Sequence, residues 1–133
     1  MSASPATVAR RWFEEIWNER RIELVDELMA PDAIGHVAPE DFRGPEGFRR
    51  MHETLCGAFP DQLVNVLAIA AEGENAFVHW QIKGTHHGPL LDIPPSGKAF
   101  DITGMTRLLV RDGKVVEGWD CWDSSKLLGH LRG

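Results

Sequence analysis

Residues 100–122 read FDITGMTRLLVRDGKVVEGWDCW. The Asp112-Gly113 pair near the middle is typical of the two-residue turn of a β-hairpin, because both residues tolerate a positive φ. The flanking residues are rich in Val, Leu, Ile and Trp, which favour strands. The sequence therefore predicts a hairpin of strands 100–111 and 114–122. Side chains alternate across a strand, so one face of the second strand carries Val116, Gly118, Asp120 and Trp122.

Two more strands are expected upstream of this hairpin. Residues 62–71 are rich in Val, Leu and Ile, and residues 76–87 alternate apolar with polar side chains. The segment between them, EGEN at 72–75, is typical of a turn. Residues 88–97 hold several glycines and prolines and are expected to form a loop at the rim of a pocket. Alternation predicts a pocket face that carries Ala76, Val78, Trp80, Ile82, Gly84 and His86.

Helices are expected before and after these strands in the sequence. Ser4-Pro5 combines an N-cap hydroxyl with a proline at the first helical position, which is typical of a helix start. Pro31 is expected to end the second helix, and residues 32–44 to form a loop that could contain a short strand. The helices predicted from apolar spacing are 5–17, 22–29, 45–59 and 124–131.

This order of elements predicts a single α+β domain over residues 1–133. Three N-terminal helices would lie on one face of a curved, cone-shaped and barrel-like sheet, mixed or antiparallel. The wide end of such a cone can enclose an apolar pocket. The five tryptophans of the chain, which has no tyrosine, could supply a broad apolar wall or simply fill an ordinary core.

Composition narrows the classes of function. The formal net charge of −6 and the scattered arginines argue against nucleic-acid binding. No apolar run approaches the roughly 18 residues of a membrane span, and the first residues do not resemble a signal peptide. Cys56 and Cys121 are expected to be free thiols in a reducing compartment, which favours the cytoplasm. The histidines and cysteines lack metal-ligand spacing, and we expect neither metal nor cofactor.

Several short motifs, taken in order, resemble the SnoaL-like polyketide cyclases of the nuclear transport factor 2-like superfamily, which also includes ketosteroid isomerase. The resemblance covers nearly the whole chain and implies the superfamily's cone-shaped fold. The matching residues are Arg43–Gly47, Phe59–Asp61, Gly84–Gly88, Pro94–Lys98, Arg107, Asp112–Glu117, Trp119, Asp120, Asp123 and Leu127–Leu131.

Asp120 is the expected proton-handling group. The resemblance implies that an aspartate at this place in the last strand acts as general acid and base. The residues point the same way, because the flanking Trp119 and Trp122 could raise the pKa of the carboxyl. The alternative is a solvated aspartate at a strand end. Asp123, beside Ser124, suits the capping of the last helix better.

His86 is the second catalytic candidate, since it could relay a proton or donate a hydrogen bond to a ligand. A hydrogen-bonded histidine at the sheet rim is an equally good interpretation. This chain departs from the family's cyclases at two positions. Thr106 stands in place of a pocket histidine, and Met51 stands in place of a polar residue of the third helix. The expected substrate-binding residues are Trp12, Trp17, His36, Met51, Trp80, Thr106 and Trp122.

Three functions remain open. The first is an enzyme that uses Asp120 in aldol cyclisation, isomerisation or dehydration of a hydrophobic carbonyl compound. The second is a partner in hydroxylation of polyketides, and the third a non-catalytic binding module for a small molecule. The resemblance also implies a homodimer formed through the outer face of the sheet. On that face, apolar Met105 and Leu109 are expected among Arg107 and Arg111.

Overall fold

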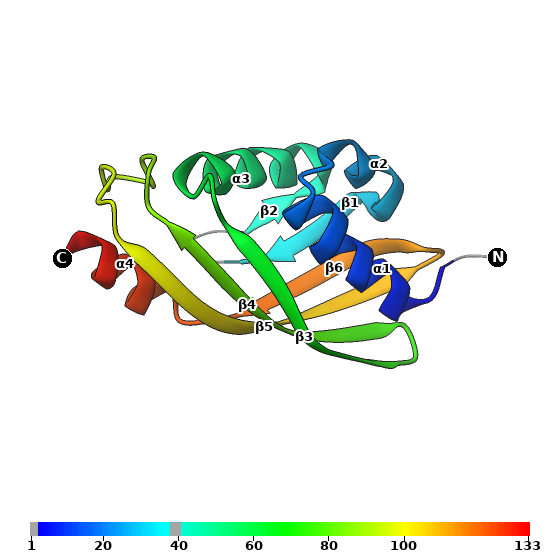
Figure 1. Ribbon diagram of the computed structural model, residues 1–133. Helices are drawn as coiled ribbons and strands as arrows, with labels where there is room; N and C mark the ends of the chain where they lie inside the picture. The colour runs from blue at the N-terminus through cyan, green and yellow to red at the C-terminus, as the bar shows by residue number, and fades with distance from the viewer. Residues whose placement is uncertain (1–2, 38–40) are drawn as a thin grey trace.

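Six strands form one curved sheet in the computed structural model, which describes residues 3–37 and 41–133 (Figure 1). The strand order is β2-β1-β6-β5-β4-β3. The β1 strand pairs parallel to β6, and all other pairs are antiparallel, so the sheet is mixed and its edges stay open. The strands are β1 Met29–His36, β2 Phe42–Arg43, β3 Leu63–Glu72, β4 Asn75–Thr85, β5 Ala99–Arg111 and β6 Lys114–Cys121.

The β5–β6 hairpin has the predicted turn. Asp112 and Gly113 have φ values of 52° and 75°, as the favoured two-residue hairpin turn requires. Arg111 pairs with Lys114 across it, and further along the same ladder Thr106 pairs with Asp120. The register shifts between Leu109 and Val110, so this irregularity, together with the turn, places the two side chains opposite each other on one face.

Helices cover the concave face of this sheet (Figure 1). The first runs straight from α1 into the wider π-helical turns of η1, and Ser4 Oγ caps it by accepting a hydrogen bond from the N–H of Thr7 at 3.2 Å. Asp123 caps the last helix by accepting from the N–H of Lys126 at 2.9 Å. The helical segments are α1 Pro5–Arg11, η1 Trp12–Asn18, η2 Ile22–Leu24, α2 Val25–Leu28, α3 Gly44–Ala58 and α4 Ser124–Arg132.

One segment differs from the prediction. The second helix ends at Leu28, and residues 29–36, expected as the end of a helix and a loop that could contain a short strand, form strand β1. Its far half pairs with β6, with His36 opposite Trp119. The register shifts between Met29 and Ile34, where Pro31 has no N–H to donate. Pairing with β6, a contact distant in sequence, thus stabilises a strand that local periodicity does not show.

Two groups of buried side chains fill the space between helices and sheet. The larger lies under α1 and α3 and includes Ile16, Phe48 and Val78. The smaller lies toward α4, at the opposite end of the molecule from the start of α1, and includes Phe100 and Leu131. Within the described ranges, no helix is both long and apolar enough to cross a membrane.

Candidate active site

A cavity of about 660 Å³ opens between the concave face of the sheet and the helices. This volume is within the range of small-molecule sites. Its wall is mainly apolar and aromatic, whereas Asp41, Arg43 and Arg50 supply charged groups along its exposed border. Four of the five tryptophans line it, namely Trp12, Trp17, Trp80 and Trp122.

Asp120 is the acidic group inside this cavity. It lies on β6 opposite Thr106 of β5, whose hydroxyl donates a hydrogen bond of 2.6 Å to Asp120 Oδ1. Burial raises the pKa of the Asp120 carboxyl from 3.8 to about 6, and the hydrogen bond from Thr106 opposes part of that rise. Such a carboxyl can both take up and release a proton near neutral pH.

A second hydrogen bond fixes the direction of the first. The indole Nε1 of Trp80 donates to Thr106 Oγ1 at 2.8 Å. A threonine hydroxyl has one proton to donate. Because the Trp80 N–H occupies an acceptor site on the Thr106 oxygen, the proton of that hydroxyl is directed toward Asp120. Thr106 is 4% exposed, so its hydroxyl is largely shielded from solvent.

Gly104 makes room for this arrangement. A Cβ at this position would lie 2.4 Å from the Trp80 ring and 2.9 Å from Trp122 Cβ. Real Cβ atoms do not approach that closely, so the absence of a side chain lets the Trp80 indole lie against β5. The hydrogen-bonded chain from Trp80 through Thr106 to Asp120 therefore depends on a glycine two residues before Thr106.

The structure brings most of the expected site residues together. Besides Asp120, the cavity wall contains Trp12, Trp17, Met51, Trp80, Thr106 and Trp122. His36 and His86 are not part of that wall. The sequence did not single out Gln62, which lines the cavity just before β3 and is 7% exposed. A lone polar residue at the start of an apolar strand was the only available signal for it.

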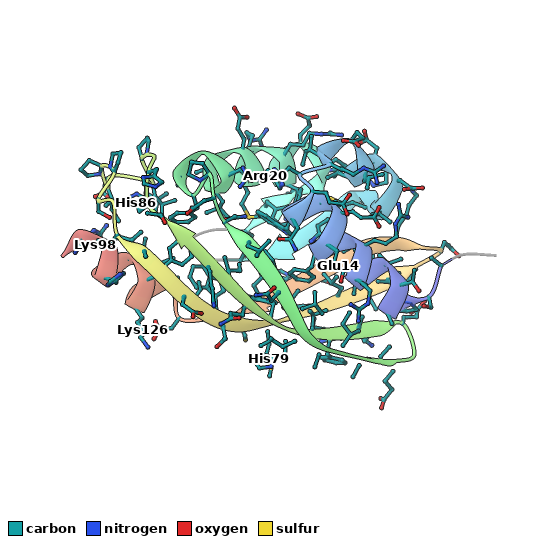
Figure 2. The ribbon with its side chains drawn as sticks, in the orientation of Figure 1. Glu14, Arg20, His79, His86, Lys98 and Lys126 are labelled. Atoms are coloured by element: carbon teal, nitrogen blue, oxygen red, sulfur yellow. The ribbon has the colours of Figure 1, made fainter. Side chains whose placement is uncertain are left out.

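His86 holds the loop between β4 and β5. Figure 2 shows it at the end of the molecule, beside that loop. The ring is fully buried, with Nδ1 2.8 Å from Ser96 Oγ and 3.2 Å from the Ser96 backbone nitrogen. Because the Ser96 N–H donates to Nδ1, the ring proton lies on Nε2. These contacts fit the alternative of a structural histidine at the sheet rim, and the proposed relay with Asp120 lacks a shared cavity.

His36 lies on the outer face of the sheet. Its Nε2 is 2.6 Å from Glu117 Oε2 and its Nδ1 3.0 Å from Asp41 Oδ2. The hydrogen bonds to Glu117 and then to Asp41 raise the pKa of the His36 ring. The ring stacks on Trp119 with 5.5 Å between centroids, and the Arg107 guanidinium lies 4.3 Å from the Trp119 ring centroid. His36 therefore belongs to a polar and aromatic cluster outside the cavity.

Metal coordination has no visible basis in the described part of the chain, since no group of three or more His, Cys, Asp or Glu side chains is placed to hold an ion there. The cavity itself presents a carboxyl with a pKa of about 6, its Thr106 donor and a mostly apolar wall.

Comparison with known proteins gives a family. A sequence profile of the SnoaL-like polyketide cyclases matches residues 7–131. A search of curated proteins finds no match.

Solved structures agree with that profile. A candidate SnoaL-like polyketide cyclase from Jannaschia sp. CCS1 is 25% identical, with a TM-score of 0.87 over 98% of this chain and 96% of that one. IdmH from Streptomyces antibioticus, a candidate polyketide cyclase, is 28% identical, with a TM-score of 0.82 over 98% and 100% of the two chains. AclR from Streptomyces galilaeus, a candidate hydroxylase, is 25% identical, with a TM-score of 0.80 over 97% and 83%.

Proposed function

Since the chain belongs to the SnoaL-like polyketide cyclase family, we propose that it is an enzyme in which Asp120 moves a proton on a hydrophobic carbonyl compound of polyketide type. The observation that carries this proposal is the position of the Asp120 carboxyl, which lines the cavity and accepts a hydrogen bond from Thr106, where burial raises its pKa to about 6. An ordinary aspartate would be a weaker base by about two pKa units. Burial in the apolar wall is what makes Asp120 a useful base.

The proton transfer can be followed atom by atom. The Asp120 carboxylate takes a proton from a carbon next to a carbonyl group, and the electron pair of that C–H bond moves onto the carbonyl oxygen to form an enolate. In an aldol cyclisation, the enolate carbon then bonds to a second carbonyl carbon of the same molecule. The protonated Asp120 returns its proton to the new alkoxide, which becomes a hydroxyl group. Isomerisation and dehydration begin with the same first step.

Thr106 supports this role by holding Asp120 in place. Its hydrogen bond occupies Oδ1, so the second carboxylate oxygen remains to meet the substrate. The aromatic wall formed by Trp12, Trp80 and Trp122 suits a flat, carbon-rich substrate. Exclusion of water from such a wall strengthens the interactions that the enolate makes.

Anthrone is a suitable probe, because its C10 protons lie between two aryl rings and are activated by the carbonyl across the middle ring. In D₂O without oxygen, the protein is expected to speed the replacement of C10 protons by deuterium, which proton NMR follows. Asp120→Asn should slow this exchange by about 100-fold or more. Asp123→Asn is the matched control, since asparagine also caps a helix. Equal exchange in the Asp120→Asn variant and the unchanged protein would refute the proposal.

A role in hydroxylation is the second candidate, favoured by the likeness to AclR. The same probe separates the two, because oxygenation would turn anthrone and O₂ into anthraquinone and water. Oxygen uptake that depends on the protein would favour this second role, and exchange without oxygen uptake the first. The third possibility is that anthrone binds without deuterium exchange or oxygen uptake, and that its affinity does not change between about pH 5 and pH 8. The protein would then be a binding module in which Asp120 only anchors the ligand.

We also propose that the protein is a homodimer formed through the outer face of its sheet. Exposed apolar side chains on that face, with Arg107 and His79 near them, suit a half-apolar interface. Figure 2 shows His79 projecting from this face, away from the helices. The exposed apolar residues that strand pairing places there are Leu63, Phe77 and Met105. The cytoplasmic location stays a prediction.

A further inference from the structure

Arg43 and Arg50 are two exposed arginines that line the cavity. Across residues 3–37 and 41–133, neither side chain makes a hydrogen bond or an ion pair, whereas every other arginine of the chain donates at least one hydrogen bond from its guanidinium group. Acidic partners are plentiful, because the chain has 20 Asp and Glu against 14 Lys and Arg. The two guanidinium groups at the mouth of the cavity are therefore available to a ligand.

Helix α3 and its N-cap residue place both arginines at this mouth. Arg50 follows Gly47 by three residues and precedes Thr54 by four, and all three line the cavity, so they share one face of the helix. Arg43 is the N-cap residue and pairs with Ile34 of β1, which also lines the cavity. Positions 43 and 50 are roughly 10 Å apart at about 1.5 Å per residue, a separation that two extended arginine side chains can bridge around one anionic group.

Asp41 is the acidic residue at the same border, and His36 already holds its carboxylate. Asp41 Oδ2 is 3.0 Å from His36 Nδ1, while His36 Nε2 is 2.6 Å from Glu117 Oε2. Each ring nitrogen thus faces a carboxylate oxygen, and both can donate only when the ring carries two protons and a positive charge. The negative charge of Asp41 is balanced by His36, which leaves the positive charges of Arg43 and Arg50 at the mouth.

The arginines lie at a distance from Asp120. Ile34 pairs with Arg43 on one side and with Glu117 on the other, so Arg43 is two strands, or roughly 10 Å, from β6. Asp120 is three residues beyond Glu117, which adds roughly 10 Å along the strand at about 3.3 Å per residue. An anionic group bound by the arginines therefore stays clear of the Asp120 carboxylate, and the ligand that reaches both must have a long body.

We propose that Arg43 and Arg50 bind a carboxylate of the substrate at the mouth of the cavity, which makes the substrate an elongated, carbon-rich carboxylic acid. A guanidinium group matches a carboxylate, because it can donate two parallel N–H bonds to it. The two arginines also provide local attraction for an anion on a protein whose formal net charge is −6. The carbon-rich body then extends inward along the aromatic wall to Asp120. This inference rests on the cavity being the substrate site, as proposed above, and names the class of compound that it takes.

The test compares anthracene-2-carboxylate with anthracene-2-carboxamide, two fluorescent probes of the same shape that differ in charge. Fluorescence titration at about pH 8, where Asp120 is ionised, measures both affinities at low salt. The unchanged protein should bind the carboxylate about tenfold more tightly than the amide. High salt should reduce this preference, because exposed ion pairs are screened.

Substitution of the arginines should remove the preference. Arg43→Gln and Arg50→Gln should each reduce it to about threefold, and the double variant should bind the two probes within about twofold of each other. The affinity for the amide should stay unchanged, since glutamine keeps part of the aliphatic stem along the wall. Arg50→Lys keeps the charge without the fork of donors, and should retain part of the preference.

Arg49→Gln is the matched control, because it removes the same charge from the neighbouring position of α3. Arg49 pairs with Asp26 at 2.6 Å and with Glu46 at 3.1 Å, and it is not part of the cavity wall. This variant should therefore keep the tenfold preference for the carboxylate that we expect of the unchanged protein, to within about twofold.

Any of four results would overturn the proposal. The double variant keeps the preference, Arg49→Gln loses as much of it as Arg50→Gln does, the unchanged protein has no preference, or it binds neither probe. The Asp120→Asn variant separates this proposal from the proposed reaction. If that variant retains full deuterium exchange but the preference depends on Arg43 and Arg50, the reaction assignment fails and the carboxylate site remains. If exchange is lost while the double variant keeps the preference, the carboxylate site fails alone.

Discussion

The pKa of the Asp120 carboxyl depends on residues that lie near it in the fold but far from it in the sequence. The sequence placed it between Trp119 and Trp122, and both were expected to raise the pKa of its carboxyl. In the structure only Trp122 lines the cavity with it, because Trp119 points to the opposite face and stacks on His36. The pKa shift has the predicted direction, but only one of the two tryptophans expected to cause it lines the cavity with Asp120. The desolvating wall comes from several elements distant in sequence, which a local pattern cannot show.

Thr106 is the residue through which the pKa of Asp120 can be adjusted. Its hydroxyl donates to the carboxylate and so lowers the pKa. Thr106→Val removes that donor, and the pKa of Asp120 should rise above 6 by about one unit. The pH dependence of anthrone exchange, or a carbon-13 NMR titration of Asp120, would measure the shift.

Two further variants control for the change at Thr106. Thr106→Ser keeps the hydroxyl and should restore most of the original midpoint. Thr103→Val is the same substitution at an exposed position of β5 and should have no effect. An unchanged midpoint in Thr106→Val would show that the hydrogen bond does not control the carboxyl.

At the scale of elements, the sequence predicted strands better than it predicted their partners. The Asp112-Gly113 turn and the alternation in β4 gave β5, β6 and β4 nearly in full, because these signals are local. For β1, the sequence indicated no more than a short strand within a loop at 32–44, since Pro31 looks like a helix stop and the pairing of Ile34 with Glu117 joins residues far apart in sequence. Likewise, His86 comes directly after β4, is buried against Ser96 of the following loop and is not part of the cavity wall.

The packing of β4 on β5 gives a test at this scale. Gly104→Ala would place a methyl group where the Trp80 ring lies, and should lower the free energy of unfolding by about 2 kcal/mol. Gly57→Ala is the matched control, because an added Cβ there meets nothing within 4 Å in α3. It should raise stability by about 0.5–1 kcal/mol through helix propensity. Urea denaturation compares the two, and equal effects would contradict the packing described here.

The whole molecule combines one curved sheet, its helical cover and a cavity between them. Its two groups of buried residues share the neighbours Ile82, Ile102 and Trp122. The single domain over residues 1–133 stays a prediction. That α+β architecture followed from the order of helices and strands. The cavity volume and the position of Gln62 did not, because they depend on how side chains pack.

Association is the prediction that belongs to this scale. Met105 is 57% exposed on the outer face, and Met105→Asp would place a charge at the centre of the proposed interface. The unchanged protein should have the mass of a dimer by light scattering, and the variant should dissociate at least about tenfold more readily. Leu91→Asp is the matched control, since Leu91 is equally exposed but lies in the β4–β5 loop. A monomeric unchanged protein would refute the dimer.

The pH profile of anthrone exchange tests the central claim most directly, because it reports the protonation state of the group that removes the proton. A base must be ionised to act, so the rate should rise with pH through a midpoint of about 6, the pKa of Asp120. Asp120→Asn should be slow and without that midpoint. A midpoint near 4, or a rise through pH 6 that persists in Asp120→Asn, would show that another group moves the proton.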